Sequence, residues 1–264
     1  MEFSFGITTA GNNDTMIQTI IDSIRSQKIP TYEILIIGNC DLSGADITVL
    51  PFDEYIKQSW ITKKKNILAQ QAKYENLVLL HDYIALEEGW YEGFLKFGNG
   101  FYFCVTRVHN IDGSRYIDYG FHPFYVMCID LRFVNGCLLP YSMKVPDPAN
   151  RLLYISGAYY IIKKSIALAV PLDEEKGWGQ GEDMDLSFAL TSVGIPVQCN
   201  SFSSVKCLKN KRGANTWWIQ EITDESLLER VRNINYQDSV KWLNSPHAGM
   251  FNGYTLYKRL QNQR

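Results

Sequence analysis

The N-terminal half alternates short apolar runs with amphipathic stretches, and no other feature constrains the fold as much. Residues 3–9 are predicted to form a strand, and the apolar runs at residues 32–38 and 77–80 are typical of strands that are buried on both faces of a sheet. Isoleucines recur at helical spacing over residues 17–24, and residues 60–73 form a second helical segment. Buried strands separated by helices predict a parallel sheet that is covered by helices.

A short strand at residues 47–52 completes the order β-α-β-β-α-β, which predicts a mainly parallel sheet. Ligands of such sheets bind beyond the carboxyl ends of the strands. The polar residues that directly follow the strands should therefore converge on one edge. They are Thr8 and Thr9, Asn39 and Asp41, Asp53 and Glu54, and His81 and Asp82.

The second half is less regular. Strands are predicted at 101–109, 115–119 and 152–162, with a turn at Asp112-Gly113 between the first two. A helix is predicted at 181–192 with Gly194 as its C-cap, and another strand begins at 196–199. We expect one domain over residues 1–210, followed by a helical extension over 211–264 that packs on the same domain and includes a capped helix at 223–233.

Composition excludes several classes of protein. The net charge of −2 gives no basic surface for a nucleic-acid partner. No apolar stretch approaches the roughly 20 residues of a membrane span. The six cysteines form no CxxC pair and no secretory signal precedes them, so we expect reduced thiols and a cytoplasmic protein. GxGxxG and GxxxxGK[ST] loops are absent, which argues against a dinucleotide-binding dehydrogenase and a P-loop NTPase.

Residues 177–185 (GWGQGEDMD) carry the strongest chemical signal. The glycines permit tight turns and close approach of backbone to a ligand. Trp178 offers a flat face for a sugar ring. Glu182 and Asp183 open a helix, where the macrodipole favours the ionised carboxylate, and such a carboxylate can accept a proton from an attacking hydroxyl. Simple N-capping by acidic residues explains the same pattern without any chemistry.

Two further groups could handle phosphate. Asp82, after the strand at 77–80, could hold a divalent ion against a diphosphate, although a solvated strand end has the same sequence. Lysines at positions 63, 64 and 65 could favour diphosphate binding. Three consecutive lysines cannot share one helix face, so at most two of them point at a ligand, and a solvated helix face is the alternative.

In this order, the pieces resemble the GT-A glycosyltransferases over residues 3–210, in particular the nucleotide-sugar-dependent transferases of family 2. The matching segments are, in chain order, Gly6-Ile7-Thr8-Thr9 at the exit of the first strand, residues 33–39 at the second strand, Lys65-Asn66 at a basic residue followed by Asn, His81-Asp82-Tyr83 at the DxD metal motif, Ser156-Gly157-Ala158 beside the donor sugar, and Gly181-Glu182-Asp183 at the acidic motif of inverting members.

The resemblance implies a GT-A (Rossmann-like) α/β fold: a mainly parallel sheet flanked by helices, an antiparallel acceptor-side part and a short C-terminal extension. It implies transfer of a sugar from a nucleotide diphosphate sugar to a hydroxyl of a glycan or glycoconjugate, with inversion. Asp183 would be the base and Glu182 would orient the acceptor or the sugar. Trp178 and Gly181 would contact the acceptor, together with residues 112–119 and 139–141.

On the donor side, the resemblance implies a divalent cation, Mn²⁺ or Mg²⁺, held by Asp82. The nucleotide-sugar site would comprise Thr8, Thr9, Asn39, Glu54, Lys65, Asn66, His81, Asp82 and Gly157.

The sequence departs from the family pattern on this donor side. Only Asp82 of its triplet is a carboxylate, Gly38 stands where many relatives carry a base-reading Asp, and residues 205–209 lack the histidine that often completes the metal site. Two other functions therefore remain open: a noncatalytic nucleotide-sugar or glycan-binding module, and a retaining transferase on the same fold.

Overall fold

The computed structural model describes residues 1–121, 137–142 and 153–209, with isolated positions between 220 and 229. The predicted β-α-β-β-α-β order is present at the start of the chain. Its elements are β1 (Phe3–Thr8), α1 (Asp14–Ser26), β2 (Tyr32–Ile37), β3 (Ile47–Leu50), α2 (Ile61–Gln71) and β4 (Asn76–His81). The predicted helix at 223–233 and the predicted extension at 211–264 lie outside the continuously described ranges.

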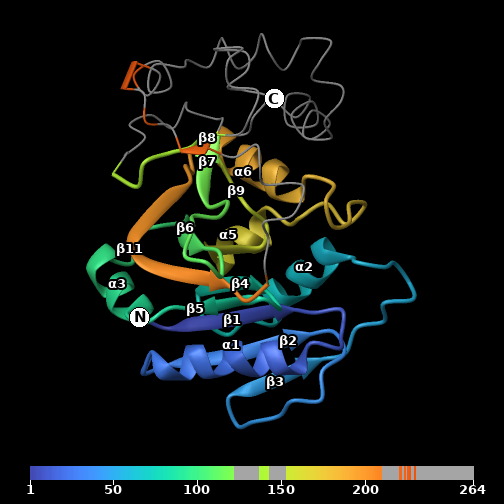
Figure 1. Ribbon diagram of the computed structural model, residues 1–264. Coiled ribbons are helices and arrows are strands. Elements are labelled where there is room, and N and C mark those ends of the chain that lie inside the picture. Colours follow the sequence, from blue (N-terminus) through green and yellow to red (C-terminus); the bar gives the residue numbers. More distant parts are fainter. Residues whose placement is uncertain are drawn as a thin grey trace.

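Further elements follow along the chain (Figure 1). They are β5 (Ile84–Leu86), α3 (Trp90–Phe97), β6 (Phe103–His109), β7 (Tyr119–Phe121), β8 (Cys137–Leu138), β9 (Leu153–Ile155), β10 (Tyr159–Lys163), α5 (Lys164–Ala169), α6 (Glu182–Ser192), β11 (Gln198–Cys207) and β12 (Gln220–Glu221). The sequence patterns did not predict β5, α3 or α5. Strand β11 extends well beyond the predicted start at 196–199.

The main sheet has eight strands in the order β3-β2-β1-β4-β10-β6-β11-β5. It is mostly parallel, as expected, and only its members β10 and β5 run against the others. The path from β1 to β2 and the path from β3 to β4 cross the sheet in opposite directions. Right-handed crossovers therefore place α1 and α2 on opposite faces, and the carboxyl ends of β1 and β4 form the switch point where ligands of such sheets bind.

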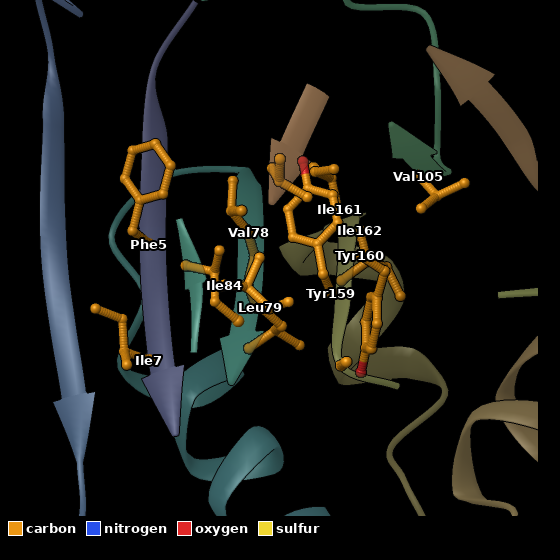
Figure 2. Packing of buried hydrophobic residues seen from close by; sticks show 14 of the residues in the cluster. Phe5, Ile7, Val78, Leu79, Ile84, Val105, Tyr159, Tyr160, Ile161 and Ile162 are labelled. Atoms are coloured by element: carbon orange, nitrogen blue, oxygen red, sulfur yellow. The ribbon is translucent and has the colours of Figure 1, made fainter. Parts of the chain in front are cut away.

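The core lies on both faces of the central strands. Every residue of β1, β4 and β10 is buried, which explains why apolar residues predominate in all three strands. Figure 2 shows side chains from these three strands lying next to one another. Helix α3 closes one end with Trp90, whose ring centroid lies 5.1 Å from that of Phe3 and whose Nε1 donates to the Tyr159 hydroxyl at 2.8 Å.

A smaller sheet has the order β12-β8-β7-β9, with β7 antiparallel to both of its neighbours. The predicted return strand at 115–119 is corrected here. The turn at Asp112-Gly113 forms, with Gly113 at φ 80°, but the chain pairs with β6 through one isolated bridge, His109 with Arg115. It then leaves the main sheet and enters the smaller one as β7. The expected antiparallel part is therefore present in a separate sheet.

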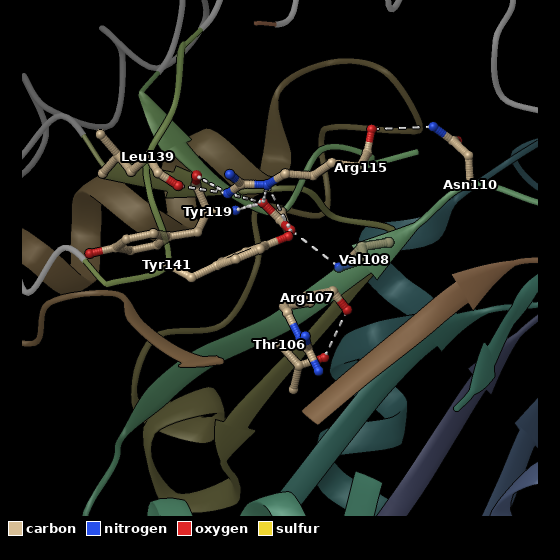
Figure 3. Close-up of polar contacts among 9 residues, drawn as sticks. Thr106, Arg107, Val108, Asn110, Arg115, Tyr119, Leu139 and Tyr141 are labelled. Atoms are coloured by element: carbon tan, nitrogen blue, oxygen red, sulfur yellow. Dashed lines mark hydrogen bonds and ion pairs between the residues drawn. The ribbon is translucent and has the colours of Figure 1, made fainter. Parts of the chain in front are cut away.

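A buried carboxylate joins the two sheets (Figure 3). Asp118 has a fully buried side chain, pairs with Arg115 at 2.7 Å, and accepts from the Tyr141 hydroxyl at 2.6 Å and from the Val108 N–H at 3.1 Å. Arg115 also donates to the Leu139 carbonyl at 2.8 Å. This network fixes residues 139–141 against the end of β6. Burial, with Asp118 nearby, raises the pKa of the Tyr141 phenol.

The predicted strand at 152–162 is also corrected. Two strands, β9 and β10, occupy that range, in different sheets, and Ser156-Gly157-Ala158 forms the turn between them. Because β10 is antiparallel to β4, this turn lies at the carboxyl end of β4, where the Ala158 carbonyl accepts from the His81 N–H at 2.9 Å. The turn therefore faces the edge at which the ligand-binding residues were expected.

Candidate functional site

The carboxyl ends of β1 and β4 meet through their side chains, as the sequence predicted. Thr9 donates its hydroxyl to Oδ2 of Asp82 at 2.9 Å, and Asn13 donates its amide to the same oxygen. Asp82 is 8% exposed, so these bonds enclose most of the carboxylate. Asn13 occupies the N-cap position of α1, but its side chain makes no capping bond and turns to Asp82 instead.

Glu54 joins the same edge through a lysine. Lys64 forms a buried ion pair with Glu54, donates to the Thr9 carbonyl at 2.6 Å, and lies 4.9 Å from the centroid of the Phe52 ring. Asn39 also lies here, since a Cβ built on Gly11 would stand 3.2 Å from the Asn39 Cβ. Thr9, Asn39, Glu54 and Asp82 thus converge on one edge, as predicted. Lys64, which was considered only as a possible diphosphate ligand, instead holds Glu54 at this edge.

Two of the expected donor residues face inward. Thr8 donates its hydroxyl to the Leu80 carbonyl at 3.2 Å, within the sheet. His81 is buried with its Nδ1 3.1 Å from the Tyr83 hydroxyl. Both side chains therefore support the edge from behind, and their expected contact with a nucleotide sugar stays a prediction.

The acidic pair lies at the start of α6, directly against the Gly157 turn. Gly181 precedes the helix with φ 75°, a left-handed conformation that favours glycine. Asp183 accepts from the Gly157 N–H at 2.7 Å through Oδ2 and from the Met184 N–H at 2.9 Å through Oδ1. Asp183 is half-buried, whereas Glu182 is 5% exposed and points inward.

Lys65 lies beneath this pair. Its side chain is 1% exposed and its ammonium group donates to the Gly157 carbonyl at 2.7 Å, with Oε1 of Glu182 3.9 Å away. Burial lowers the pKa of Lys65, and the carboxylates of Glu182 and Asp183 act against that effect. Burial raises the pKa of Glu182 to about 7, helped by the negative charge of Asp183 and opposed by Lys65.

Helix α2 holds the glycine-rich segment in place. Asn66 accepts from the Leu172 N–H and donates to the Leu172 carbonyl, both at 2.9 Å, and Thr62 donates to the Lys176 carbonyl at 2.6 Å. The Asn66 amide is thus bonded within the protein, and its expected contact with the donor stays a prediction. The segment presents Trp178 outward with 63% exposure.

Asp185, one turn from Gly181 along α6, pairs with Lys176. Its role is therefore structural, since the ion pair anchors the glycine-rich segment to the helix. Lys176 was not recognised from the sequence, because nine residues separate it from Asp185 and no helical period relates the two.

The residues present do not by themselves make a metal centre. Within the described ranges, no three His, Cys, Asp or Glu side chains stand close enough together to hold an ion. Asp82 supplies one carboxylate, and Oδ2 of that group already accepts hydrogen bonds from Thr9 and Asn13. A cation at this edge would need most of its ligands from a bound diphosphate.

No family model and no curated protein matches the chain, but solved structures do. GalNAc-T7 with UDP, GalNAc and Mn²⁺ superposes with a TM-score of 0.58 and 15% identity, over 88% of this chain and 47% of that one. The mannosyltransferase PcManGT from Pyrobaculum calidifontis, in complex with GDP-Man and Mn²⁺, gives 0.51 and 11%, over 80% and 58%. The chain has a GT-A fold.

Residues 1–349 of S. aureus TarS, in complex with UDP, give a TM-score of 0.50 and 12% identity, over 92% of this chain and 71% of that one. The chain spans less than half the length of the GalNAc-T7 chain. At these identities the likeness concerns the fold alone. Across the described ranges, no helix combines the length and the apolar character that crossing a bilayer requires.

Proposed function

We propose that this chain is a glycosyltransferase that moves a sugar from a nucleotide diphosphate sugar to a hydroxyl of a glycan or glycoconjugate, with inversion. One observation carries the proposal: the half-buried carboxylate of Asp183 stands at the N-terminus of α6 against the Gly157 turn. That turn bonds to His81, next to the edge formed by Thr9 and Asp82. The proposed base and the proposed donor site thus share one edge of a GT-A fold.

Asp183 would act as the general base. The acceptor oxygen bonds to the anomeric carbon of the donor while the bond from that carbon to the diphosphate oxygen breaks. The acceptor proton passes to Asp183, and the nucleotide diphosphate leaves. The N–H groups of Gly157 and Met184 hold the carboxylate in one orientation, which keeps its remaining lone pairs available to a hydroxyl.

Glu182 and Trp178 would support that reaction from either side of the base. Glu182 is buried behind Asp183 and orients the groups around it. Trp178 is 63% exposed, beside the acidic helix, which leaves its face open for an acceptor sugar ring. Gly181 allows the chain to turn tightly between the two.

The donor would lie along the β1–β4 edge. Thr9, Asn39 and Glu54 line that edge, with Thr9 fixed to Asp82 and Glu54 fixed to Lys64. The solved neighbours carry UDP or GDP-Man, which supports a nucleoside diphosphate sugar as the donor class. Mn²⁺ is present in two of them, but Asp82 alone is a poor ion site in this chain. No step is therefore assigned to a metal.

A thermal-shift screen of UDP- and GDP-sugars, with and without Mn²⁺, would identify the donor, because a ligand that binds only the folded state raises the unfolding midpoint. An increase that requires Mn²⁺ would show that donor binding needs the cation, and an increase without it would place the diphosphate on protein groups alone. Absence of any increase would contradict the proposal.

The rate of sugar transfer by the Asp183→Asn variant then tests whether Asp183 is the general base. We expect turnover to fall about 10²- to 10⁴-fold, the usual contribution of a general base, with the donor-induced thermal shift retained. Glu175→Gln is the matched control, since Glu175 is an exposed acid in the adjoining segment. Loss of donor binding with normal turnover of the remaining complex would refute this role for Asp183.

A noncatalytic binding module is the second candidate, and the single enclosed carboxylate at Asp82 favours it. It predicts donor binding without transfer or hydrolysis. A retaining transferase predicts activity with the anomeric configuration of the donor kept in the product, which proton NMR of the product distinguishes from inversion.

A further inference from the structure

Lys65 is enclosed at the centre of the acid-bearing region. Its side chain is 1% exposed, its ammonium group lies 5.0 Å from the centroid of the Tyr160 ring, and its hydrogen bond goes to the Gly157 carbonyl at 2.7 Å. Burying an ammonium group costs desolvation free energy unless hydrogen-bond acceptors or opposite charges compensate for the lost water. The partners of Lys65 are the Gly157 turn and the acid pair.

Both backbone groups of Gly157 are held by hydrogen bonds. Its N–H donates to Asp183 at 2.7 Å, and its carbonyl accepts from Lys65 at 2.7 Å. There is no spare room around it, because a Cβ at position 157 would lie 2.8 Å from Oε1 of Glu182. A shift of the turn would therefore move Asp183 as well.

The charge of Lys65 also faces Glu182. The distance from its Nζ to Oε1 of Glu182 is 3.9 Å, and both side chains are almost fully buried. At that separation in a poorly solvated region, an ammonium group favours the ionised carboxylate. The other titratable groups that act on Glu182 or are acted on by it are Asp183 beside it, Lys176 from the glycine-rich segment, Tyr160 from β10, and Tyr83 after β4.

We propose that Lys65 is the positioning residue of the acid pair: its ammonium group anchors the Gly157 turn that orients Asp183, and it stabilises the ionised form of Glu182. This assignment rests on the proposed function of the acid pair. It differs from the diphosphate contact that the family resemblance implies for Lys65, because the ammonium group here is enclosed and directed at the acids.

The two assignments predict different effects of Lys65→Met. A positioning residue affects the orientation and ionisation of the acids while nucleotide binding is kept. A diphosphate ligand affects nucleotide binding and leaves the acids unchanged. Lys163→Met is a matched control. Lys163 is also buried, but it lies on β10 and its ammonium group bonds to Asn76 and Asn99 instead of to the acid pair.

The deciding experiment is a carboxyl-carbon NMR titration of Glu182 in protein labelled with ¹³C-glutamate, with the signal assigned through Glu182→Gln. Since burial raises the pKa of Glu182 to about 7, we expect the wild-type signal to titrate near pH 7. In Lys65→Met we expect the midpoint to rise by about one pH unit or more, because an opposite charge at this distance lowers a carboxyl pKa by about 1–3 units. In Lys163→Met we expect no change. A folded Lys65→Met protein with an unchanged Glu182 midpoint would overturn the proposal.

A reciprocal measurement covers the case in which Lys65→Met does not fold. Glu182→Gln keeps the shape of the side chain and removes its charge, so the ¹⁵Nζ signal of Lys65 should titrate at lower pH than in wild type. An unchanged Lys65 midpoint would show that the two groups are not coupled and would refute the proposal.

Calorimetric titration with UDP and with GDP separates this proposal from the proposed function. We expect each nucleotide to bind Lys65→Met within about threefold of its wild-type affinity. A loss of tenfold or more, with Glu182 unchanged, would assign Lys65 to the diphosphate. If neither nucleotide binds wild type, the proposed function fails, whereas the two NMR titrations still decide the role of Lys65.

Discussion

Glu182 is a buried acid whose protonation couples the site to the stability of the protein. Its pKa is raised from 4.5 to about 7, chiefly by burial. The folded state therefore holds this proton more tightly than the unfolded state does. The resulting stabilisation is complete below pH 4.5 and is lost as the pH rises through 7.

Glu182→Gln should remove that pH dependence. Between pH 4.5 and pH 8, we expect the wild type to lose about 3 kcal/mol of unfolding free energy relative to the variant, which has no proton to release. Urea denaturation of both proteins at several pH values measures this difference. A constant difference across the range would show that folding does not shift the pKa of Glu182.

The three consecutive lysines illustrate what the sequence can and cannot specify at this scale. Helical geometry predicted that they diverge, and they do: Lys63 pairs with Glu174, Lys64 with Glu54, and Lys65 with the Gly157 turn. Their partners are far away in the chain, so helical periodicity could not name them. The bond from Asn13 to Asp82 could not be predicted for the same reason, because Asp82 directly follows β4, far along the chain from α1.

At the scale of elements, α2 acts as the support of the glycine-rich segment. Asn66 is 8% exposed and satisfies both backbone groups of Leu172, which is itself buried. In Asn66→Ala those groups lose their partner. We expect a loss of about 1–3 kcal/mol in unfolding free energy for each group that remains buried, and faster hydrogen exchange of the Leu172 amide.

Lys63→Ala is the matched control for that change. Lys63 comes from the same helix and bonds to Glu174 in the same segment, but both side chains are more than a third exposed, at 37% and 36%. Such surface pairs contribute less than about 1 kcal/mol. Equal losses in the two variants would contradict the supporting role assigned to Asn66.

Elements with a clear period were predicted well, and those defined by tertiary pairing were not. The stripe of α1 and the apolar runs of β1, β2 and β4 identified these elements to within a few residues. Residues 152–162 appeared as one strand because hydropathy cannot detect a turn flanked by apolar residues. Helix α3 is short and aromatic, and a short aromatic stretch matches a strand as well as a helix.

For the whole molecule, the order of the early elements predicted the parallel sheet and the convergence of polar residues at the carboxyl ends of its strands. The order β4-β10-β6-β11 could not be predicted from the sequence. Strand β10 pairs antiparallel with β4, although more than seventy residues separate the two strands in the chain. That insertion brings the Gly157 turn and α6 to the carboxyl ends of β1 and β4. The acid pair was recognised from the sequence, but its support by Lys65 depends on this topology.

Strand β4 joins the two parts of the site, and Leu79 lies at the junction: it is paired with Gly6 of β1 on one side and with Tyr160 of β10 on the other. Leu79 is 2% exposed, so Leu79→Ala should cost about 2–5 kcal/mol. Because one strand carries both pairings, we expect the slowly exchanging amides of β1 and β10 to lose protection by the same free energy. Leu95→Ala, on a 54% exposed leucine of α3, should leave both unchanged. Loss of protection in β10 alone would mean that β10, with the adjoining Gly157 turn and α6, unfolds independently of β1.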